Sequence, residues 1–186
     1  MDTRDFLAMT LLQTGTVRGR TKLQKLVYFV GLLTDQLDSL GYRPHFYGPY
    51  SDDVARAVAQ LREMGVVDQN VTDWGYSRQG FEVRRYDFQL SEAGRAYAQQ
   101  LVRRHDNEAR SIRDAVKRYQ DAGDQDYMDL SIAAKAYFLL GEKKGVASTN
   151  DLAQLAARFG WSVNKDQIVR AAKYLQRLGL VEVDDN

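Results

Sequence analysis

The most restrictive feature of this sequence is an apolar seam that runs through residues 21–40. Its members alternate spacings of three and four: Leu23, Leu26, Val30, Leu33, Leu37 and Leu40. This spacing predicts one long amphipathic helix, and the apolar side of that helix must be buried against another element. Gly41 follows the seam and is expected to end the helix, because glycine readily adopts the left-handed backbone found at helix C-termini.

A turn and a second amphipathic helix follow the seam. Pro44 and Pro49 are the only prolines in the chain, and they lie in an aromatic turn where no helix or strand is expected. Ser51 is expected to cap the next helix, with Asp52 and Asp53 placing negative charge at its N-terminus. The buried face of this helix is predicted to consist of Val54, Ala57, Val58, Leu61 and Met64. This part of the chain therefore predicts a helix-turn-helix.

Two segments of this region resemble the signatures of a known family. Residues 22–28 (KLQKLVY) and 45–51 (HFYGPYS) are similar to the K-L-Q-K and F-Y-G-P-(Y/F)-S motifs of YwgA-like bacterial and archaeal proteins. More loosely, they resemble the K-L-x-K-L helix and Y-G-P turn of the Panacea antitoxin domain. Residues 90–95 (LSEAGR) resemble the helix start that follows the wing in many winged-helix regulators. The resemblance covers about the first half of the chain and implies a winged-helix fold with a role in DNA binding or toxin-antitoxin regulation.

Between residues 66 and 90 the hydrophobic pattern becomes typical of strands. Val66 and Val67 form a short apolar run, residues 70–80 are rich in turn-forming residues, and apolar and polar residues then alternate up to Leu90. This order predicts a β-hairpin wing. Basic and aromatic side chains near its tip have two open interpretations, contact with DNA or packing on the hairpin itself: Trp74, Tyr76, Arg78, Arg84 and Arg85.

A single long helix is predicted after the wing, from a cap at Ser91 to about Asp121. It is the expected partner of the apolar seam, within one subunit or across a homodimer. We expect a homodimer, because two-fold readers of DNA commonly pair through helices outside the reading head. The polar segment 121–126 then marks a boundary between two domains, residues 1–122 and 123–186.

The second domain repeats the helix-turn-helix order. Its expected elements are a helix ending near Gly141, a basic turn at 142–145, a helix over 150–159 capped by Ser148 or Thr149, a turn at 160–162, a helix over 164–178 and a strand at 180–183. The predicted fold class is therefore mainly α with a small β-hairpin wing: a winged helix-turn-helix protein with two winged-helix-like units joined by a long helix.

Side chains in four places, all of them basic except Gln60, are candidate contacts to double-stranded DNA. The candidates are Arg18, Arg20 and Lys22 before the seam, Arg56 and Gln60 on the helix after Ser51, Arg84 and Arg85 on the wing, and Lys165, Arg170, Lys173 and Arg177 on the last helix. The net charge is only +1, so any such surface must be a local patch. A solvated charged surface is the alternative for the sets before the seam, on the helix after Ser51 and on the last helix.

The chain is expected to act as a DNA-binding transcriptional or toxin-antitoxin regulator. The alternative is a protein-interaction module, antitoxin-like or an adaptor, that uses the same surface without DNA. Three carboxylates on the presumed reading helix favour the alternative, because they repel phosphate: Asp52, Asp53 and Glu63. Genomic context would distinguish the two.

Composition and motif content exclude several other classes. No apolar run reaches the roughly eighteen residues needed to span a membrane, and the first residues lack a secretion signal. With no cysteine there is no disulfide or thiolate metal site, so we expect a cytoplasmic protein without membrane association.

Enzyme signatures are also missing from the sequence. His45 and His105 are not spaced as metal ligands, and neither a phosphate-binding glycine loop nor a serine-nucleophile motif occurs. We expect no catalysis, cofactor or metal. His45 beside Tyr47 and Tyr50 is the one cluster suited to chemistry, but the turn's aromatic rings are expected to pack against the long helix instead.

Overall fold

The computed structural model describes residues 1–76, 82–142 and 148–182 of the chain. Three parts of the sequence interpretation lie outside the described residues: Arg78, most of the basic turn at 142–145, and Val183. The side chains of Trp74 and Tyr76 also lie outside the description.

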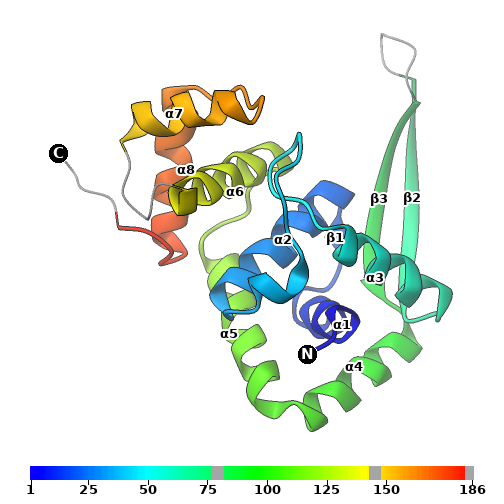
Figure 1. Ribbon diagram of the computed structural model, residues 1–186. Helices are drawn as coiled ribbons and strands as arrows, with labels where there is room; N and C mark the ends of the chain where they lie inside the picture. The colour runs from blue at the N-terminus through cyan, green and yellow to red at the C-terminus, as the bar shows by residue number, and fades with distance from the viewer. Residues whose placement is uncertain (77–81, 143–147, 183–186) are drawn as a thin grey trace.

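The described residues form a mainly helical protein with one small antiparallel sheet, as predicted. In chain order the elements are α1 (Thr3–Thr14), β1 (Val17–Arg18), α2 (Arg20–Leu33), the 3-10 helix η1 (Leu37–Leu40), α3 (Asp52–Glu63), β2 (Val67–Tyr76), β3 (Glu82–Leu90), α4 (Glu92–Arg104), α5 (Asp106–Asp121), α6 (Tyr127–Glu142), α7 (Thr149–Arg158) and α8 (Lys165–Arg177). The sheet order is β1-β3-β2 (Figure 1). None of the helices in the described ranges combines the length and hydrophobicity that a bilayer crossing requires.

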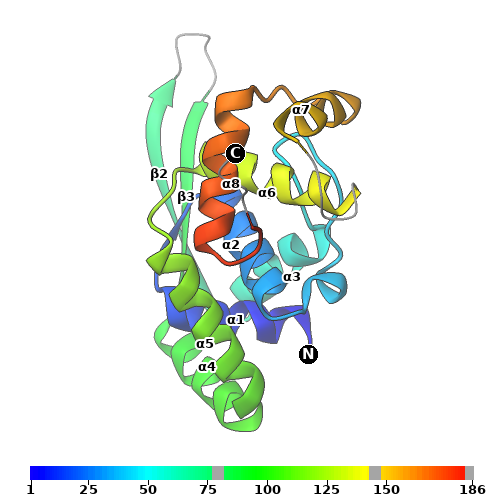
Figure 2. The same cartoon turned by 90° about the vertical axis from the view of Figure 1, so that its left-hand side faces the viewer.

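The N-terminal core is built around α1, which contacts α3, α4 and α5. Figures 1 and 2 show α1 enclosed by these helices and by α2. Its buried side chains include Phe6, Leu7, Met9 and Leu11. A helix buried on most sides needs apolar residues beyond a single stripe, and the DFLAMTLL sequence of α1 supplies them.

The prediction of one helix through residue 40 is wrong, because α2 ends at Leu33. Asp35 adopts a left-handed conformation (φ 56°), and the Gln36 amide donates to the Gly31 carbonyl at 2.8 Å. This is the hydrogen-bond pattern of a Schellman helix end, here with aspartate in the position that glycine usually occupies. The remaining seam residues form η1, which folds back so that the Leu40 side chain lies against Gly31.

The prediction of one continuous helix from residue 91 to 121 is also wrong. The chain breaks at His105 (φ −127°, ψ 54°), which separates α4 from α5. Both helices pack on α1 and meet at an angle below it in Figure 1. A straight helix would carry its second half away from the core. The break instead lets Leu101 of α4 and Ile112 of α5 be buried in the same N-terminal core.

The hairpin is longer than predicted, because β2 continues through most of the segment expected to be a loop. Asn70 pairs with Asp87 and Thr72 pairs with Arg85 in one antiparallel register. Ladder pairing with β3 therefore overrides the low strand propensity of these residues. The hairpin extends away from the helices, and Figure 1 places it on the opposite side of α2 from α7 and α8.

A second core joins α2 to the C-terminal helices. Tyr28 and Phe29 of α2 are fully buried among residues of α6 and α8, including Leu130, Tyr174 and Leu175. The Phe29 and Tyr174 rings meet edge to face with centroids 5.8 Å apart. The same helix thus supplies both cores, one on each side.

Two details of the C-terminal region differ from the sequence interpretation. The connection between α7 and α8 is six residues long rather than three, from Phe159 to Asn164. Residues 180–182 form no strand; Leu180 and Val181 instead pack against the second core. The Leu180 amide donates to the Leu175 carbonyl at 3.0 Å, which turns the chain back onto α8.

Candidate functional site

The two segments that carry the family resemblance bind each other directly. The Gln24 side-chain amide donates to the Ser51 carbonyl at 2.9 Å and accepts from the Ser51 amide at 3.1 Å. The Lys25 ammonium donates to the Pro49 carbonyl at 2.6 Å. All three hydrogen bonds are buried, so α2 fixes the backbone of the turn through two neutral bonds from Gln24 and one from the Lys25 ammonium.

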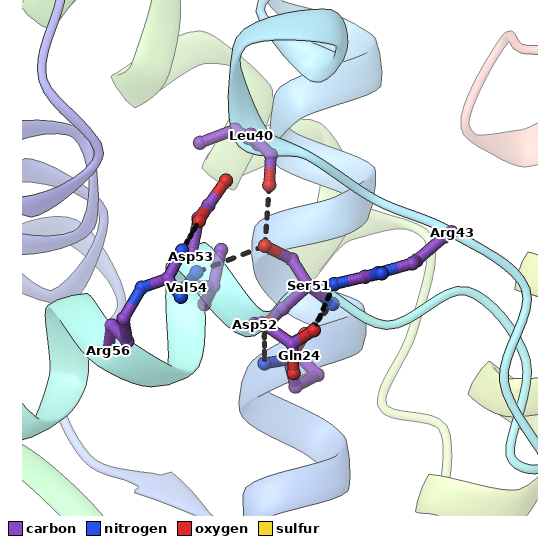
Figure 3. A network of polar contacts seen from close by, with 8 residues as sticks. All are labelled: Gln24, Leu40, Arg43, Ser51, Asp52, Asp53, Val54 and Arg56. Carbon is purple, nitrogen blue, oxygen red and sulfur yellow. Dashed lines mark hydrogen bonds and ion pairs between the residues drawn. The ribbon is translucent and has the colours of Figure 1, made fainter.

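Ser51 also joins η1 to α3, as Figure 3 shows. Its hydroxyl accepts from the Val54 amide at 3.0 Å, the cap predicted from the sequence, and donates to the Leu40 carbonyl at 2.5 Å. Two ion pairs surround this cap: Arg43 with Asp52, and Arg56 with Asp53.

The expectation that the turn's aromatic rings pack on the long helix is wrong for two of them. Phe46 is 69% exposed and Tyr47 is 47% exposed, and their rings contact each other edge to face at 5.1 Å. The side of the turn facing α6 is occupied by backbone. Gly48 has a φ of 88°, and a side-chain carbon there would lie 3.1 Å from the Ser131 carbonyl. This close approach leaves no room for a side chain between Gly48 and α6.

A pocket of about 330 Å³ opens on the other side of the turn. Its walls come from the start of α2, the turn itself, α3 and the base of the sheet. The basic side chains that line it are Arg20, Lys25, His45 and Arg62. Among its described lining residues there is no carboxylate, so the pocket is cationic although the whole chain is nearly neutral.

Lys25 is the most unusual group in this pocket. It is 1% exposed, and burial together with the charge of Lys135 on α6 lowers its pKa to about 7. Its described hydrogen-bond partner is the neutral Pro49 carbonyl. The Lys135 pKa is also lowered by burial. The burial of Lys25 was not predicted from the sequence, and its position within the apolar stretch of α2 was the available signal.

The three predicted DNA contacts before or at the start of α2 differ in exposure and in the groups that they contact. Arg18 is exposed on β1. The Arg20 guanidinium lies over the Tyr86 ring, 3.8 Å from the centroid, at the edge of the pocket. The Lys22 ammonium pairs with Asp124 at 2.5 Å. Arg18 and Arg20 therefore present charge to solvent, whereas Lys22 is directed to the connection between α5 and α6.

Arg56 on α3 and the described cations of the hairpin are paired with carboxylates, whereas Arg62 of α3 lines the pocket. Arg56 pairs with Asp53 one turn earlier on α3, and Gln60 is exposed on the same helix. On the hairpin, Arg84 lies 3.6 Å from Asp73. Arg85 makes two hydrogen bonds to Asp87, at 2.9 and 3.1 Å. These pairs reduce the positive charge that α3 and the hairpin present to a phosphate backbone.

The last helix holds cations with no described ion pair. Lys165, Arg170 and Lys173 are exposed on α8, opposite its buried residues. No carboxylate lies within ion-pair distance of them among the residues that the structure describes. Arg177 differs from them, since its Nε donates to the Ala122 carbonyl at 3.0 Å. Its guanidinium also lies 5.7 Å from the Tyr174 ring centroid.

Metal binding finds no support in the described residues, where no three His, Asp or Glu side chains gather to hold an ion. No protein-family model matches the chain, and no curated protein matches it significantly.

Proposed function

We propose that this chain is a DNA-binding regulator of the winged-helix class and that its main DNA-contacting element is α8. The observation that carries the proposal is the set of exposed cations on α8, Lys165, Arg170 and Lys173, which have no ion pair among the described residues. Arg170 and Lys173 are three positions apart and are neighbours on the helix surface, where they can contact phosphates or base edges together, and Lys165 lies in the first turn on the same exposed side.

The order of elements in the N-terminal part supports the winged-helix assignment. A helix, a short strand, two helices and a hairpin follow each other, and the first strand adds to the hairpin in the order β1-β3-β2. The connection between α2 and α3 is much longer than the three or four residues of a simple helix-turn-helix. The extra residues form η1 and the turn that Gln24 and Lys25 hold.

Charge distribution decides which unit we assign to DNA. Arg56 of α3 and the described cations of the hairpin contact Asp53, Asp73 or Asp87, whereas Lys165, Arg170 and Lys173 of α8 are exposed to solvent. Non-specific DNA affinity comes mainly from lysine and arginine replacing counterions on phosphates. A homodimer is part of the proposal, and analytical ultracentrifugation of the full chain tests it.

Fluorescence anisotropy with genomic DNA fragments at two salt concentrations tests the DNA proposal. The test variant combines Lys165→Gln, Arg170→Gln and Lys173→Gln. The control combines Arg103→Gln, Arg104→Gln and Arg113→Gln, exposed cations of α4 and α5, with the same change in net charge. We expect the test variant to weaken binding and to reduce the salt slope by about 0.9 for each lost phosphate contact. Equal loss in both variants, or no binding by the wild type at low salt, contradicts the proposal.

A protein-interaction module is the second candidate, favoured by the exposed Phe46 and Tyr47 rings on the turn. Aromatic side chains are enriched at the centres of protein interfaces. Co-expression with the product of an adjacent gene, followed by purification, tests this function. A stoichiometric complex that Phe46→Ala abolishes and Met64→Ala retains supports it, because Met64 is an exposed apolar residue beyond the end of α3.

A further inference from the structure

We propose that the pocket between α2, α3, the turn and the sheet base binds a small aromatic anion, a planar ring that carries a carboxylate or a phosphate. This ligand site does not depend on whether the chain binds DNA. Its volume of about 330 Å³ is at the lower end of ligand sites in proteins, so it suits a metabolite-sized molecule rather than a peptide or polynucleotide.

Charge is the first reason for an anion. Arg20 stands at one edge of the pocket, Arg62 enters from the last turn of α3, and Lys25 lies at its buried end. No Asp or Glu side chain among the described residues lines the pocket. Guanidinium groups match the two oxygens of a carboxylate or phosphate, and a site with two of them favours such a group over a neutral one.

The partners of Lys25 give the second, independent reason. An ammonium group has three donors, and the structure assigns one of them to the Pro49 carbonyl. A buried ammonium is costly unless it is paired, and the charged group that acts on it among the described residues is another cation, Lys135. An anion at this end of the pocket supplies the missing counter-charge. The lowered pKa of Lys25 is consistent with a group that lacks this partner in the free protein.

The apolar walls explain why the anion should carry a ring. Leu23 and Val58 face the pocket from the two helices, and Phe88 closes it at the sheet. Tyr47 and Tyr50 line it from the turn, with the Tyr50 ring 5.1 Å from that of His45. Aromatic and aliphatic walls with a few convergent charges are typical of sites that hold a ring and orient it through one polar group.

Isothermal titration calorimetry of the full chain tests this site with four probes. Phenyl phosphate and benzoate carry a ring and a charge, benzamide carries the ring without charge, and inorganic phosphate carries the charge without a ring. We expect phenyl phosphate or benzoate to bind at least about tenfold more tightly than benzamide and inorganic phosphate. The comparison between phenyl phosphate and benzoate then identifies the anionic group.

Two variants connect any binding to the pocket. Lys25→Met removes the buried charge but also the bond to Pro49, so it can disturb the turn. Arg62→Gln changes an exposed side chain and leaves the turn contacts intact. We expect Arg62→Gln to weaken binding about tenfold, with Arg103→Gln as an unaffected control. Lack of saturable binding by both ring anions, benzamide or inorganic phosphate binding as tightly as they do, or unchanged affinity in Arg62→Gln overturns the proposal.

Discussion

The Trp161 indole donates a hydrogen bond to the His45 carbonyl at 2.7 Å, although the two residues are 116 positions apart in the sequence. Trp161 belongs to the connection between α7 and α8, and it is buried there with the rings of Phe138 and Phe159. His45 belongs to the turn that lines the pocket. This bond therefore ties the C-terminal helices to the same turn that Gln24 and Lys25 hold from the other side.

Trp161→Phe is expected to destabilise the protein by about 1–3 kcal/mol, because it leaves the His45 carbonyl without its partner and removes part of a buried ring. Urea unfolding measures the loss. His45→Ala is the matched control, since it keeps the backbone carbonyl that accepts the bond. If His45→Ala costs as much as Trp161→Phe, the contact between the His45 and Tyr50 rings contributes as much to holding the turn as the indole bond does.

Gln24→Glu is expected to cost about 2–3 kcal/mol of stability, because a buried carboxylate cannot donate to the Ser51 carbonyl and its charge is poorly solvated. The side chain keeps its size, so packing is unchanged. Gln60→Glu makes the same chemical change on the exposed face of α3 and should shift stability by no more than about 0.5 kcal/mol. Thermal unfolding of both variants provides the measurement. Equal stability of Gln24→Glu and wild type would show that the paired bonds to Ser51 contribute nothing.

Local signals in the sequence predicted much of the fold. Ser51 caps α3 as expected, and Ser91 caps α4 by accepting from the Gly94 amide at 2.9 Å. The helix ends that the sequence did not predict lack the usual glycine signal. Asp35 ends α2 in a left-handed conformation, and His105 separates α4 from α5. Both breaks serve tertiary packing, since they let apolar faces fold back onto α1 and α2, and a local pattern does not carry that information.

The candidate site was harder to predict than the fold. Charged residues were assigned to DNA from their spacing, but spacing cannot show that Arg85 pairs with Asp87, two positions away on the same strand face, or that Lys22 reaches Asp124. The pocket combines residues from four segments, and Arg62 joins it only because α3 lies beside the base of the sheet. The sequence did carry one signal that α2 is buried on both sides. The run from Leu26 to Gly31 is apolar on every side, which is typical of a helix buried between two layers.

Gly48→Ala is expected to destabilise the protein more than Gly65→Ala does. Both glycines have positive φ angles, 88° and 69°, so both substitutions carry a similar backbone cost of about 1 kcal/mol. Only at Gly48 does the added carbon meet neighbours, at 3.0 Å from Lys135 Cγ and 3.1 Å from the Ser131 carbonyl. The difference between the two unfolding free energies measures how tightly the turn packs on α6. Equal losses would mean that the turn moves away from α6 without cost.

The stability of the protein is expected to rise with pH through the range in which Lys25 titrates. The folded-state pKa of Lys25 is lowered to about 7 from an ordinary value of 10.5, so between these values the unfolded chain binds more protons than the folded chain. The cost of burying the ammonium is fully present below about pH 7 and disappears as pH rises toward the unfolded pKa. Buried tyrosines oppose this trend only at higher pH, because burial raises the pKa of Tyr28 and Tyr42 above the ordinary value of 10.0.

Unfolding in urea between about pH 7 and pH 9 should therefore show wild type gaining stability relative to Lys25→Met, by at most about 1.4 kcal/mol per pH unit. The control is Lys117→Met, at an exposed lysine of α5, whose free energy of unfolding should change with pH in parallel with that of wild type. If the free energy of unfolding of Lys25→Met also changes in parallel with wild type, Lys25 keeps an ordinary pKa in the folded protein.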